Sequence, residues 1–452
     1  MIDCHYLISF VLFLYYIMGT TKHILLFGAG KSATVLINYL GKITQKNNWI
    51  CTIADIDLPT IEAKIYGVKT LLAKEIQIND AEARKSIIEK ADVVISMLPP
   101  ALHYLVATDC LILRKHLLTA SYIDSSIRNM EKDIEAAGLL FLGEMGLDPG
   151  IDHMSAMKMI HHIQAQGGHI HSFKSHCGGL VAPESDTNPW HYKISWNPRN
   201  IVTAGKAGAI YREDHEIKEV TYQQIFENCK EITVKDLGQL SFYPNRDSLS
   251  YIPVYGLENV ATFIRTTLRY PAFCSGWEKI VAAGFTNDDI TINTDGMSYT
   301  QFFHEILKDK IIEIQGNIVL NDQFNYLGMN NHHLINKGIQ PIANVLQQLL
   351  EEKWKLSKGD KDLIVMKHEI DYKLFNKNHH VNSTLLVKGD DELNTAMAKT
   401  VGLPLGIAAT LLLENKLTVR GLHIPIIQEI YDPVLSALEQ EGIVFDEEDT
   451  IV

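Results

Sequence analysis

Short apolar runs alternate with helix-like stretches over the first third of the chain. The run 24–27 is uniformly apolar, and Val35, Leu36 and Leu40 follow it at the spacing of one helix face. Similar runs occupy 49–54, 93–98, 116–122 and 139–142, and residues 127–137 predict a charged surface helix. Uniformly apolar strands that alternate with helices are typical of a parallel sheet covered on both faces. We therefore predict an α/β fold in which this part forms a doubly wound, Rossmann-type sheet.

The pattern changes after residue 150. The sequence predicts a helix over 151–166, strands over 170–176 and 201–202, and a polar loop rich in glycine and proline over 177–185. A mostly helical, acidic section covers about 284–358, the runs 362–372 and 380–389 pair as a hairpin, and an apolar helix covers 395–412. This mixture indicates a second domain of mixed α/β type.

Composition and charge narrow the classes of function. The chain has 452 residues, of which 46% are hydrophobic and 21% charged, and its net charge is −13. An acidic chain without Lys/Arg runs is not typical of a nucleic-acid-binding protein. Six scattered cysteines without a C-x-x-C pair indicate free thiols in a reducing compartment. Because we recognise no targeting signal, we predict the cytoplasm. The 19 histidines match no zinc spacing, so we predict no metal site.

The first residues form an apolar stretch, 6–18, of about the length of a signal peptide and short for a bilayer span. No Lys or Arg precedes it, and no convincing small-residue cleavage site separates it from the first strand. We interpret residues 1–17 as an upstream extension from a misassigned start codon, with Met18 as the natural start. We predict no association with a membrane.

The turn after the first strand has the pattern G-x-G-x-x-A at Gly28, Gly30 and Ala33. In a strand–turn–helix unit, these residues permit the tight turn, the approach of a pyrophosphate and close helix packing. Asp55 ends the second predicted strand, where an acid can accept hydrogen bonds from the adenosine ribose. We predict dinucleotide binding; the alternative is a doubly wound fold that binds something else.

Polar side chains mark the predicted strand ends, where open α/β sheets place ligands. Ser121, Tyr122 and Asp148 are such residues, and Tyr122 and Asp148 have acid–base chemistry. An Asp before Pro-Gly is equally a common turn former. Arg246 and Arg269 could each fork onto a carboxylate, although singly either is also typical of a surface or structural arginine.

Longer stretches resemble the glutamate-forming saccharopine dehydrogenases, also called saccharopine reductases. This family includes the fungal enzyme and the dehydrogenase half of animal aminoadipic semialdehyde synthase. The resemblance runs from about Lys22 to the C-terminus. It depends on GEMGLDPGIDHMSAMK (143–158), SHCGGLVAPESDTNPWHYKISW (175–196), YPNRDS (243–248) and TLRYPAF (267–273), with support from TASYI (119–123) and AMAKTVGLP (396–404).

The resemblance implies an architecture and a reaction. Beyond the extension at 1–20, it implies a Rossmann domain over 21–150 and a substrate-binding and dimerisation domain over 151–390 with a helical insertion at about 284–358. A C-terminal segment, 391–452, would return to the Rossmann domain. The implied enzyme is a homodimer that oxidises saccharopine with NAD(P) to glutamate and 2-aminoadipate 6-semialdehyde, or runs the reverse reaction.

Residue roles follow from the matched motifs. The predicted cofactor-binding residues are Gly28, Gly30, Lys31, Ser32, Ala33, Asp55, Leu98, Ala120, Ser121 and Tyr122. The predicted substrate-binding residues are Ser121, Tyr122, Asp148, Arg246, Thr267, Leu268 and Arg269. Asp148 and Tyr122 are the candidate catalytic residues, because imine hydrolysis needs a water and a proton shuttle.

One departure from the fungal pattern concerns the cofactor. Fungal enzymes that prefer NADP have an Arg after the second strand, whereas this chain has Ala54-Asp55-Ile56-Asp57 and no Lys or Arg before Lys64. Carboxylates repel a 2′-phosphate and suit ribose hydroxyls, so we predict NAD over NADP.

Two other functions remain open at this point. A carboxynorspermidine- or homospermidine-type oxidoreductase of the same superfamily would need acidic pockets for polyamines, which Arg246 and Arg269 oppose. A non-catalytic protein with a retained Rossmann domain would bind the cofactor without turning over saccharopine.

Overall fold

The computed structural model describes residues 21–452, which divide into two compact units. The first comprises the described residues up to Gly150 together with Val401–Pro425, and the second comprises Ile151–Thr400 and Ile426–Val452. The predictions about residues 1–17 and the start at Met18 lie outside the described residues.

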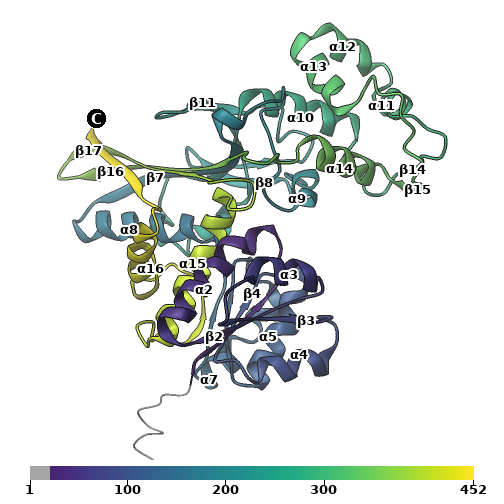
Figure 1. The fold of residues 1–452 in the computed structure, drawn as a ribbon. Helices are drawn as coiled ribbons and strands as arrows, with labels where there is room; N and C mark the ends of the chain where they lie inside the picture. The colour runs from purple at the N-terminus through teal and green to yellow at the C-terminus, as the bar shows by residue number, and fades with distance from the viewer. Residues whose placement is uncertain (1–20) are drawn as a thin grey trace, which may run out of the picture. The chain divides into compact units, whose positions relative to one another are not determined.

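The first unit contains a seven-stranded parallel sheet with the order β18-β6-β5-β4-β1-β2-β3 (Figure 1). Its strands are β1 (His23–Phe27), β2 (Ile50–Asp55), β3 (Leu71–Glu75), β4 (Val93–Ser96), β5 (His116–Thr119), β6 (Leu140–Leu142) and β18 (Gly421–His423). Strands run outward in both directions from the neighbouring β1 and β4, which makes this pair the switch point where such sheets bind ligands. The predicted doubly wound sheet is confirmed.

Helices cover both faces of this sheet, as the uniformly apolar strands predict (Figure 1). They are α2 (Thr34–Asn47), α3 (Leu58–Ile65), α4 (Ala81–Ile88), α5 (His103–Ile112), α6 (Ser125–Arg128) and α7 (Glu131–Ala136), with the 3-10 turns η1 (Lys31–Ala33) and η2 (Pro100–Leu102). Leu25 and Phe27 of β1 lie in one buried cluster with residues of α4, α5 and α7.

Helix α15 (Ala396–Leu413) packs against α2 with very little space between them. A Cβ at Gly402 would lie 2.9 Å from Leu36 Cβ and 3.1 Å from Leu36 N. By length and composition α15 could also cross a bilayer, yet 83% of it is buried inside the protein. We therefore interpret it as a core helix.

The second unit is built on a ten-stranded mixed sheet. Its main order is β10-β11-β13-β7-β16-β17-β19, and β8 connects β9 and β12 to β13. The strands are β7 (His169–Val181), β8 (Ala209–Glu213), β9 (Glu216–Val220), β10 (Lys230–Val234), β11 (Gly238–Pro244), β12 (Arg246–Asp247), β13 (Thr262–Arg269), β16 (Asp362–Leu374), β17 (Lys377–Lys388) and β19 (Phe445–Ile451). The predicted hairpin is confirmed as β16 and β17.

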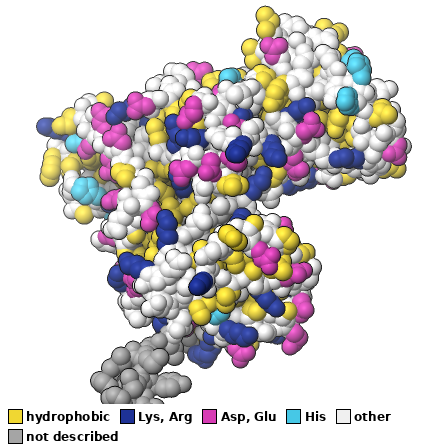
Figure 2. Space-filling model, viewed as in Figure 1, with side chains coloured by type: hydrophobic (Ala, Val, Ile, Leu, Met, Phe, Trp, Pro, Cys, Tyr) yellow, Lys and Arg dark blue, Asp and Glu magenta, His cyan; other side chains and the backbone are white. Residues whose placement is uncertain are grey.

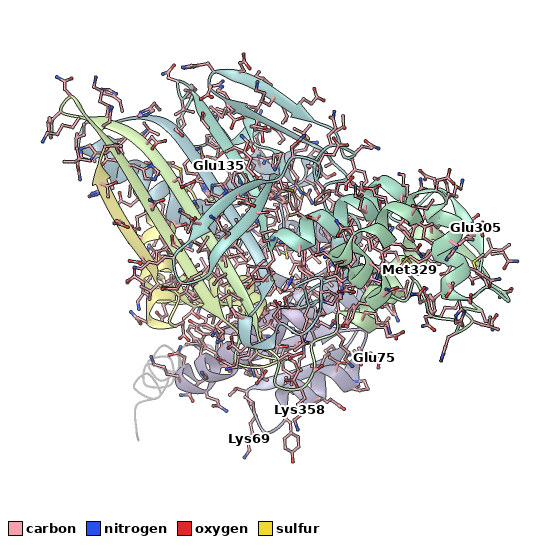
Figure 3. The ribbon with its side chains drawn as sticks, turned by 90° about the horizontal axis from the view of Figure 1, so that it is seen from above. Lys69, Glu75, Glu135, Glu305, Met329 and Lys358 are labelled. Carbon is pink, nitrogen blue, oxygen red and sulfur yellow. The ribbon has the colours of Figure 1, made fainter. Side chains whose placement is uncertain are left out.

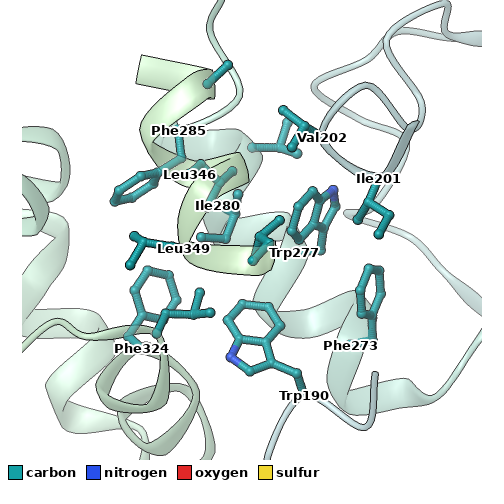
Figure 4. Close-up of a cluster of buried hydrophobic side chains, with 14 of the residues drawn as sticks. Trp190, Ile201, Val202, Phe273, Trp277, Ile280, Phe285, Phe324, Leu346 and Leu349 are labelled. Carbon is teal, nitrogen blue, oxygen red and sulfur yellow. The ribbon is translucent and has the colours of Figure 1, made fainter. Parts of the chain in front are cut away.

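A mostly helical section of this unit has a core of its own. Its elements are α10 (Pro271–Ala283), α11 (Tyr299–Leu307), α12 (Lys310–Gly316), α13 (Ile318–Leu327), α14 (Ile342–Lys353) and the short pair β14 (Thr291–Asn293) and β15 (Ile339–Pro341). Trp190, Trp277 and Trp354 are fully buried in this core, and Figure 4 shows Trp190 and Trp277 among its aliphatic side chains. Figure 3 labels two contrasting residues of the section, the exposed Glu305 and the buried Met329.

Three local predictions are wrong. Residues 201–202 end the helix α9 (Pro198–Val202), because Pro198 starts it and Asn197 caps it by accepting from the Arg199 N–H at 3.0 Å. Residues 177–181, expected in a loop, continue β7, since all five pair with β16 and Cys177 also pairs with β13. The single helix expected over 127–137 is two short ones, α6 and α7.

The C-terminal segment differs from the predicted boundary, which returned all of 391–452 to the Rossmann domain. Only Val401–Pro425 belongs to the first unit, where β18 pairs with β6. Helix α8 (Ile151–Ala165) contacts α16 (Gln428–Gln440), and β19 pairs with β17, so the last residues belong to the second unit.

Charged side chains of both signs are interspersed on the face of the molecule drawn in Figure 2. Such a mixed distribution is typical of a solvated protein surface.

We expect Gly402→Ala to lower the free energy of unfolding by about 1–3 kcal/mol, because the added methyl group would overpack the contact with α2. Gly316→Ala is the matched control, since it makes the same change in a helix with no atom within 4 Å. That control should leave stability unchanged or raise it by up to about 1 kcal/mol. Urea unfolding followed by circular dichroism measures both; equal midpoints for the two variants would contradict the packing argument.

Candidate functional site

The glycine turn of the first unit follows β1 at the switch point of the sheet. Gly28 has a φ of +96°, and a Cβ there would lie 2.9 Å from the carbonyl oxygen of Met97, just after β4. Its N–H donates to the Ala54 carbonyl at 2.9 Å. Only glycine tolerates this left-handed backbone and close approach together, so the predicted role of Gly28 in the tight turn is confirmed.

Gly30 faces open space. A Cβ there would have nothing within 4 Å, and Gly30 lies directly before η1 and α2. Amide groups of a first helical turn have no intrahelical acceptors, and they favour an anion together with the helix dipole. The open backbone and the helix start therefore fit a dinucleotide diphosphate. Lys31 is exposed, Ser32 is half-buried and Ala33 is buried in this first turn.

Asp55 at the end of β2 supports the same turn. Its Oδ2 accepts from the Ala29 N–H at 2.7 Å, and its Oδ1 accepts from the Asp57 N–H at 3.1 Å. A carboxylate has about four acceptor positions, so these two bonds leave room for ribose hydroxyls. The acid thus both holds the turn and is available to a ligand.

Lys64 is a residue of this site that the sequence interpretation used only as the first cation after Asp55. Its Nζ donates to the carbonyl oxygens of Ala29 and Gly30, each at 2.7 Å. Burial lowers the pKa of Lys64, and the charge of Asp55 partly opposes this effect. Helical spacing on α3 could not show that its side chain returns to the glycine turn.

The other predicted residues of this unit follow the carboxyl ends of neighbouring strands. Leu98 comes shortly after β4, Ala120, Ser121 and Tyr122 follow β5, and Asp148 follows β6. All five are half-buried. Asp148 lies in a turn closed by a hydrogen bond from the Gly146 N–H to the Pro149 carbonyl at 3.0 Å. The predicted position at strand ends is confirmed; the catalytic roles of Tyr122 and Asp148 stay predictions.

His103 is a second residue to which the sequence interpretation gave no role. Its Nε2 lies 2.8 Å from the Ser121 hydroxyl, and its Nδ1 lies 2.8 Å from the Ser96 hydroxyl. Burial lowers the pKa of His103 to about 4, with a smaller opposing effect from Asp124. The imidazole is therefore neutral near pH 7. A lone His after Pro-Pro gives no sequence signal for these contacts, because they join the ends of two separate strands.

In the second unit, β13 places the predicted substrate-binding residues. Thr267 pairs with Cys177 of β7 and with Tyr243 of β11. Leu268 is fully buried in a hydrophobic cluster, so its side chain is committed to the core. Burial raises the pKa of Tyr243 to about 12, and Arg269 partly opposes this shift.

Arg269 is buried, with 5% of its surface exposed, and no carboxylate among the described residues pairs with it. Its Nη1 donates to the Leu268 carbonyl at 2.7 Å, while its Nε is buried without a hydrogen-bond partner. The guanidinium lies over the rings of Tyr192 and Phe273, at 5.3 and 5.5 Å from their centroids. A buried cation normally has an anionic partner, so this position fits a ligand carboxylate.

Arg246 is exposed and has a φ of +54° in β12, where it pairs with Ala209 of β8. Its predicted contact with a substrate carboxylate stays a prediction. No group of three or more His, Cys, Asp or Glu residues within 21–452 is arranged to hold a metal ion.

Comparison with known proteins gives consistent matches. The family model described as "Saccharopine dehydrogenase NADP binding domain" matches residues 24–142, and "Saccharopine dehydrogenase C-terminal domain" matches 146–443. The chain is 31% identical to alpha-aminoadipic semialdehyde synthase of Arabidopsis thaliana, over 94% of this chain and 45% of that protein. It is 30% identical to saccharopine dehydrogenase [NADP(+), L-glutamate-forming] of Saccharomyces cerevisiae, over 95% of this chain and 99% of the yeast protein.

A solved structure agrees with these matches. The apo saccharopine dehydrogenase (L-Glu forming) from Saccharomyces cerevisiae superposes with a TM-score of 0.86 at 28% identity, over 95% of this chain and 100% of that one. The chain spans about half the length of the semialdehyde synthases it matches.

We expect Gly30→Ala to weaken the binding of reduced nicotinamide dinucleotide by about tenfold or more while leaving thermal unfolding unchanged. The added methyl would enter the space where a diphosphate approaches the backbone, but it would meet no protein atom within 4 Å. Nucleotide fluorescence titration and differential scanning calorimetry measure the two effects. Undiminished affinity would show that the diphosphate does not approach at Gly30.

Proposed function

This chain belongs to the saccharopine dehydrogenase family, and we propose that it interconverts saccharopine with glutamate and 2-aminoadipate 6-semialdehyde. In the oxidative direction, saccharopine, NAD(P)⁺ and water give glutamate, the semialdehyde, NAD(P)H and a proton. The bound nicotinamide would supply the hydride acceptor. The protein's own residues would bind the substrate carboxylates and repel cationic ligands from the site. They would also move protons to and from the amine nitrogen.

The single observation that supports this proposal best is the buried Arg269 without an acidic partner. Its Nε and Nη2 form the edge of a guanidinium that takes a carboxylate through two parallel hydrogen bonds, and neither makes such a bond within the described chain. Saccharopine has three carboxylates. The buried charge also opposes the polyamine alternative, because a cationic substrate would be repelled there.

The remaining roles are proposed from the matched motifs. Thr267 and Arg246 would contact further substrate oxygens, with Leu268 contributing only its backbone. Tyr122 and Asp148 would serve the proton transfers of imine formation and hydrolysis. We further propose a homodimer in the cytoplasm; the mouse, rat and cattle synthases that the chain resembles are named as mitochondrial proteins.

For the cofactor we propose NAD in preference to NADP, although the fungal relatives are named for NADP(+). Asp55 stands where the adenosine ribose would bind, and its charge opposes a 2′-phosphate. Lys64, the nearest cation on α3, is already bonded to two carbonyl oxygens of the turn.

We expect purified protein to reduce NAD with saccharopine at a kcat/KM at least about tenfold above that with NADP. Asp55→Ser should bring the kcat/KM values for NAD and NADP closer together, because it removes the charge and puts a neutral hydroxyl in its place. Absorbance of the reduced nicotinamide measures both. Equal turnover with both cofactors would refute the preference, and cofactor binding without saccharopine turnover would favour the non-catalytic alternative.

We expect Arg269→Lys to lower kcat/KM for saccharopine about 100-fold or more, because the charge remains but the two-bond fork is lost. Arg269→Met should abolish turnover while keeping or raising the melting temperature, since it removes a buried charge without a protein partner. Steady-state kinetics and calorimetry separate the two effects. A strongly destabilised Arg269→Met protein would show that the arginine is structural.

A further inference from the structure

A chain of hydrogen bonds crosses the ends of two neighbouring strands in the first unit. It runs from the Ser96 hydroxyl at the end of β4, through both ring nitrogens of His103, to the Ser121 hydroxyl after β5. Both outer distances are 2.8 Å, within the normal range for strong hydrogen bonds. We call these three residues the Ser96–His103–Ser121 relay.

Ser96, the buried end of the relay, determines which group donates each of its hydrogen bonds. Ser96 is fully buried, and its hydroxyl has no acceptor within the described chain other than Nδ1 of His103. Leaving a buried O–H without an acceptor is costly, so Ser96 donates to Nδ1. A neutral imidazole that accepts at Nδ1 has its hydrogen on Nε2.

The Thr119 hydroxyl competes only weakly with Ser121 for the hydrogen bond from Nε2 of His103. Thr119 Oγ1 lies 3.4 Å from Nε2 and also accepts from the Ser121 N–H at 3.3 Å. Both contacts are long, whereas the bond to Ser121 is short. Nε2–H therefore donates to the Ser121 oxygen.

This arrangement has a consequence for Ser121. Its oxygen accepts from His103, and its own O–H has no acceptor in the described part of the chain, although the side chain is half-buried. We propose that the Ser96–His103–Ser121 relay holds Ser121 as a hydrogen-bond donor to a carboxylate or carboxamide oxygen of the bound substrate or nicotinamide cofactor. His103 is then a positioning residue, which acts through Ser121. The inference rests on the proposed function for the identity of these ligands, but not for the direction of the relay.

The direction can be measured without turnover. Selective labelling with ¹⁵N-histidine shows which ring nitrogen carries the proton, and His103→Gln identifies the signals of His103 by their loss. We expect a protonated Nε2 and an unprotonated Nδ1. A protonated Nδ1 would overturn the relay whether or not the protein acts on saccharopine.

Kinetics tests whether His103 acts through Ser121. We expect His103→Leu to reduce kcat/KM for saccharopine about tenfold, and to have almost no further effect in the Ser121→Ala protein. His103→Gln should recover much of the loss, because its amide N–H can donate to Ser121. An equal loss in both backgrounds, with no recovery by glutamine, would overturn the proposal.

Two measurements on the Ser121→Ala protein, the KM for saccharopine and the affinity for NADH, identify which oxygen Ser121 contacts. A raised KM for saccharopine with unchanged affinity for NADH would assign the substrate carboxylate, and a weakened affinity for NADH would assign the carboxamide. No change in either would overturn the proposed donor role. If the wild-type protein does not turn over saccharopine, the proposed function fails, while the ring-nitrogen measurement and the affinity for NADH still test the relay.

Discussion

The burial of parallel strands on both faces is the constraint on which the first unit depends. Few polar side chains lie along such strands, so most of them collect where the strands end. Because all seven strands run in one direction, these ends share one edge of the sheet. Asp55 ends one strand, and Gly28, Ser121 and Asp148 follow three others, so this common direction gives the four residues a shared edge. The close approach of Gly28 to Met97 shows how tightly the edge is packed at the switch point.

Much of this could be predicted from the sequence. The apolar runs predicted the parallel sheet, and the glycine pattern predicted the turn, because both are local signals with a direct physical cause. The hairpin of β16 and β17 could equally be predicted from the sequence. The predictions for 201–202 and 177–181 were wrong because short apolar or glycine-rich stretches do not determine their own secondary structure. A proline and an asparagine cap start the helix that contains 201–202. Pairing with distant strands keeps 177–181 in the sheet.

The contacts made by long side chains could not be predicted. Lys64 reaches the glycine turn from α3, and His103 joins two strand ends from the start of α5. Both contacts depend on which helices pack over which strands, and no spacing in the sequence encodes that. The acidic strand β19 was missed for a related reason, since its exposed acidic side chains hide the pattern of a strand at the edge of a sheet.

The strand β13 carries two buried arginines, one of which pairs with an acid of the fold while the other pairs with no acid among the described residues. Arg265 and Arg269 lie four residues apart, so both project from the same face of the strand, and both are almost completely buried. Arg265 donates to the buried Asp152 at 2.7 Å and lies over the ring of Tyr251. Arg269 has aromatic neighbours as well, but no acid in the described part of the chain pairs with it. Burying a charge without a partner lowers stability, and proteins retain such costs mainly where function requires them. The absence of a carboxylate beside Arg269 among the described residues, rather than the presence of arginine in the sequence, is therefore the physical reason to propose a role for it in substrate binding.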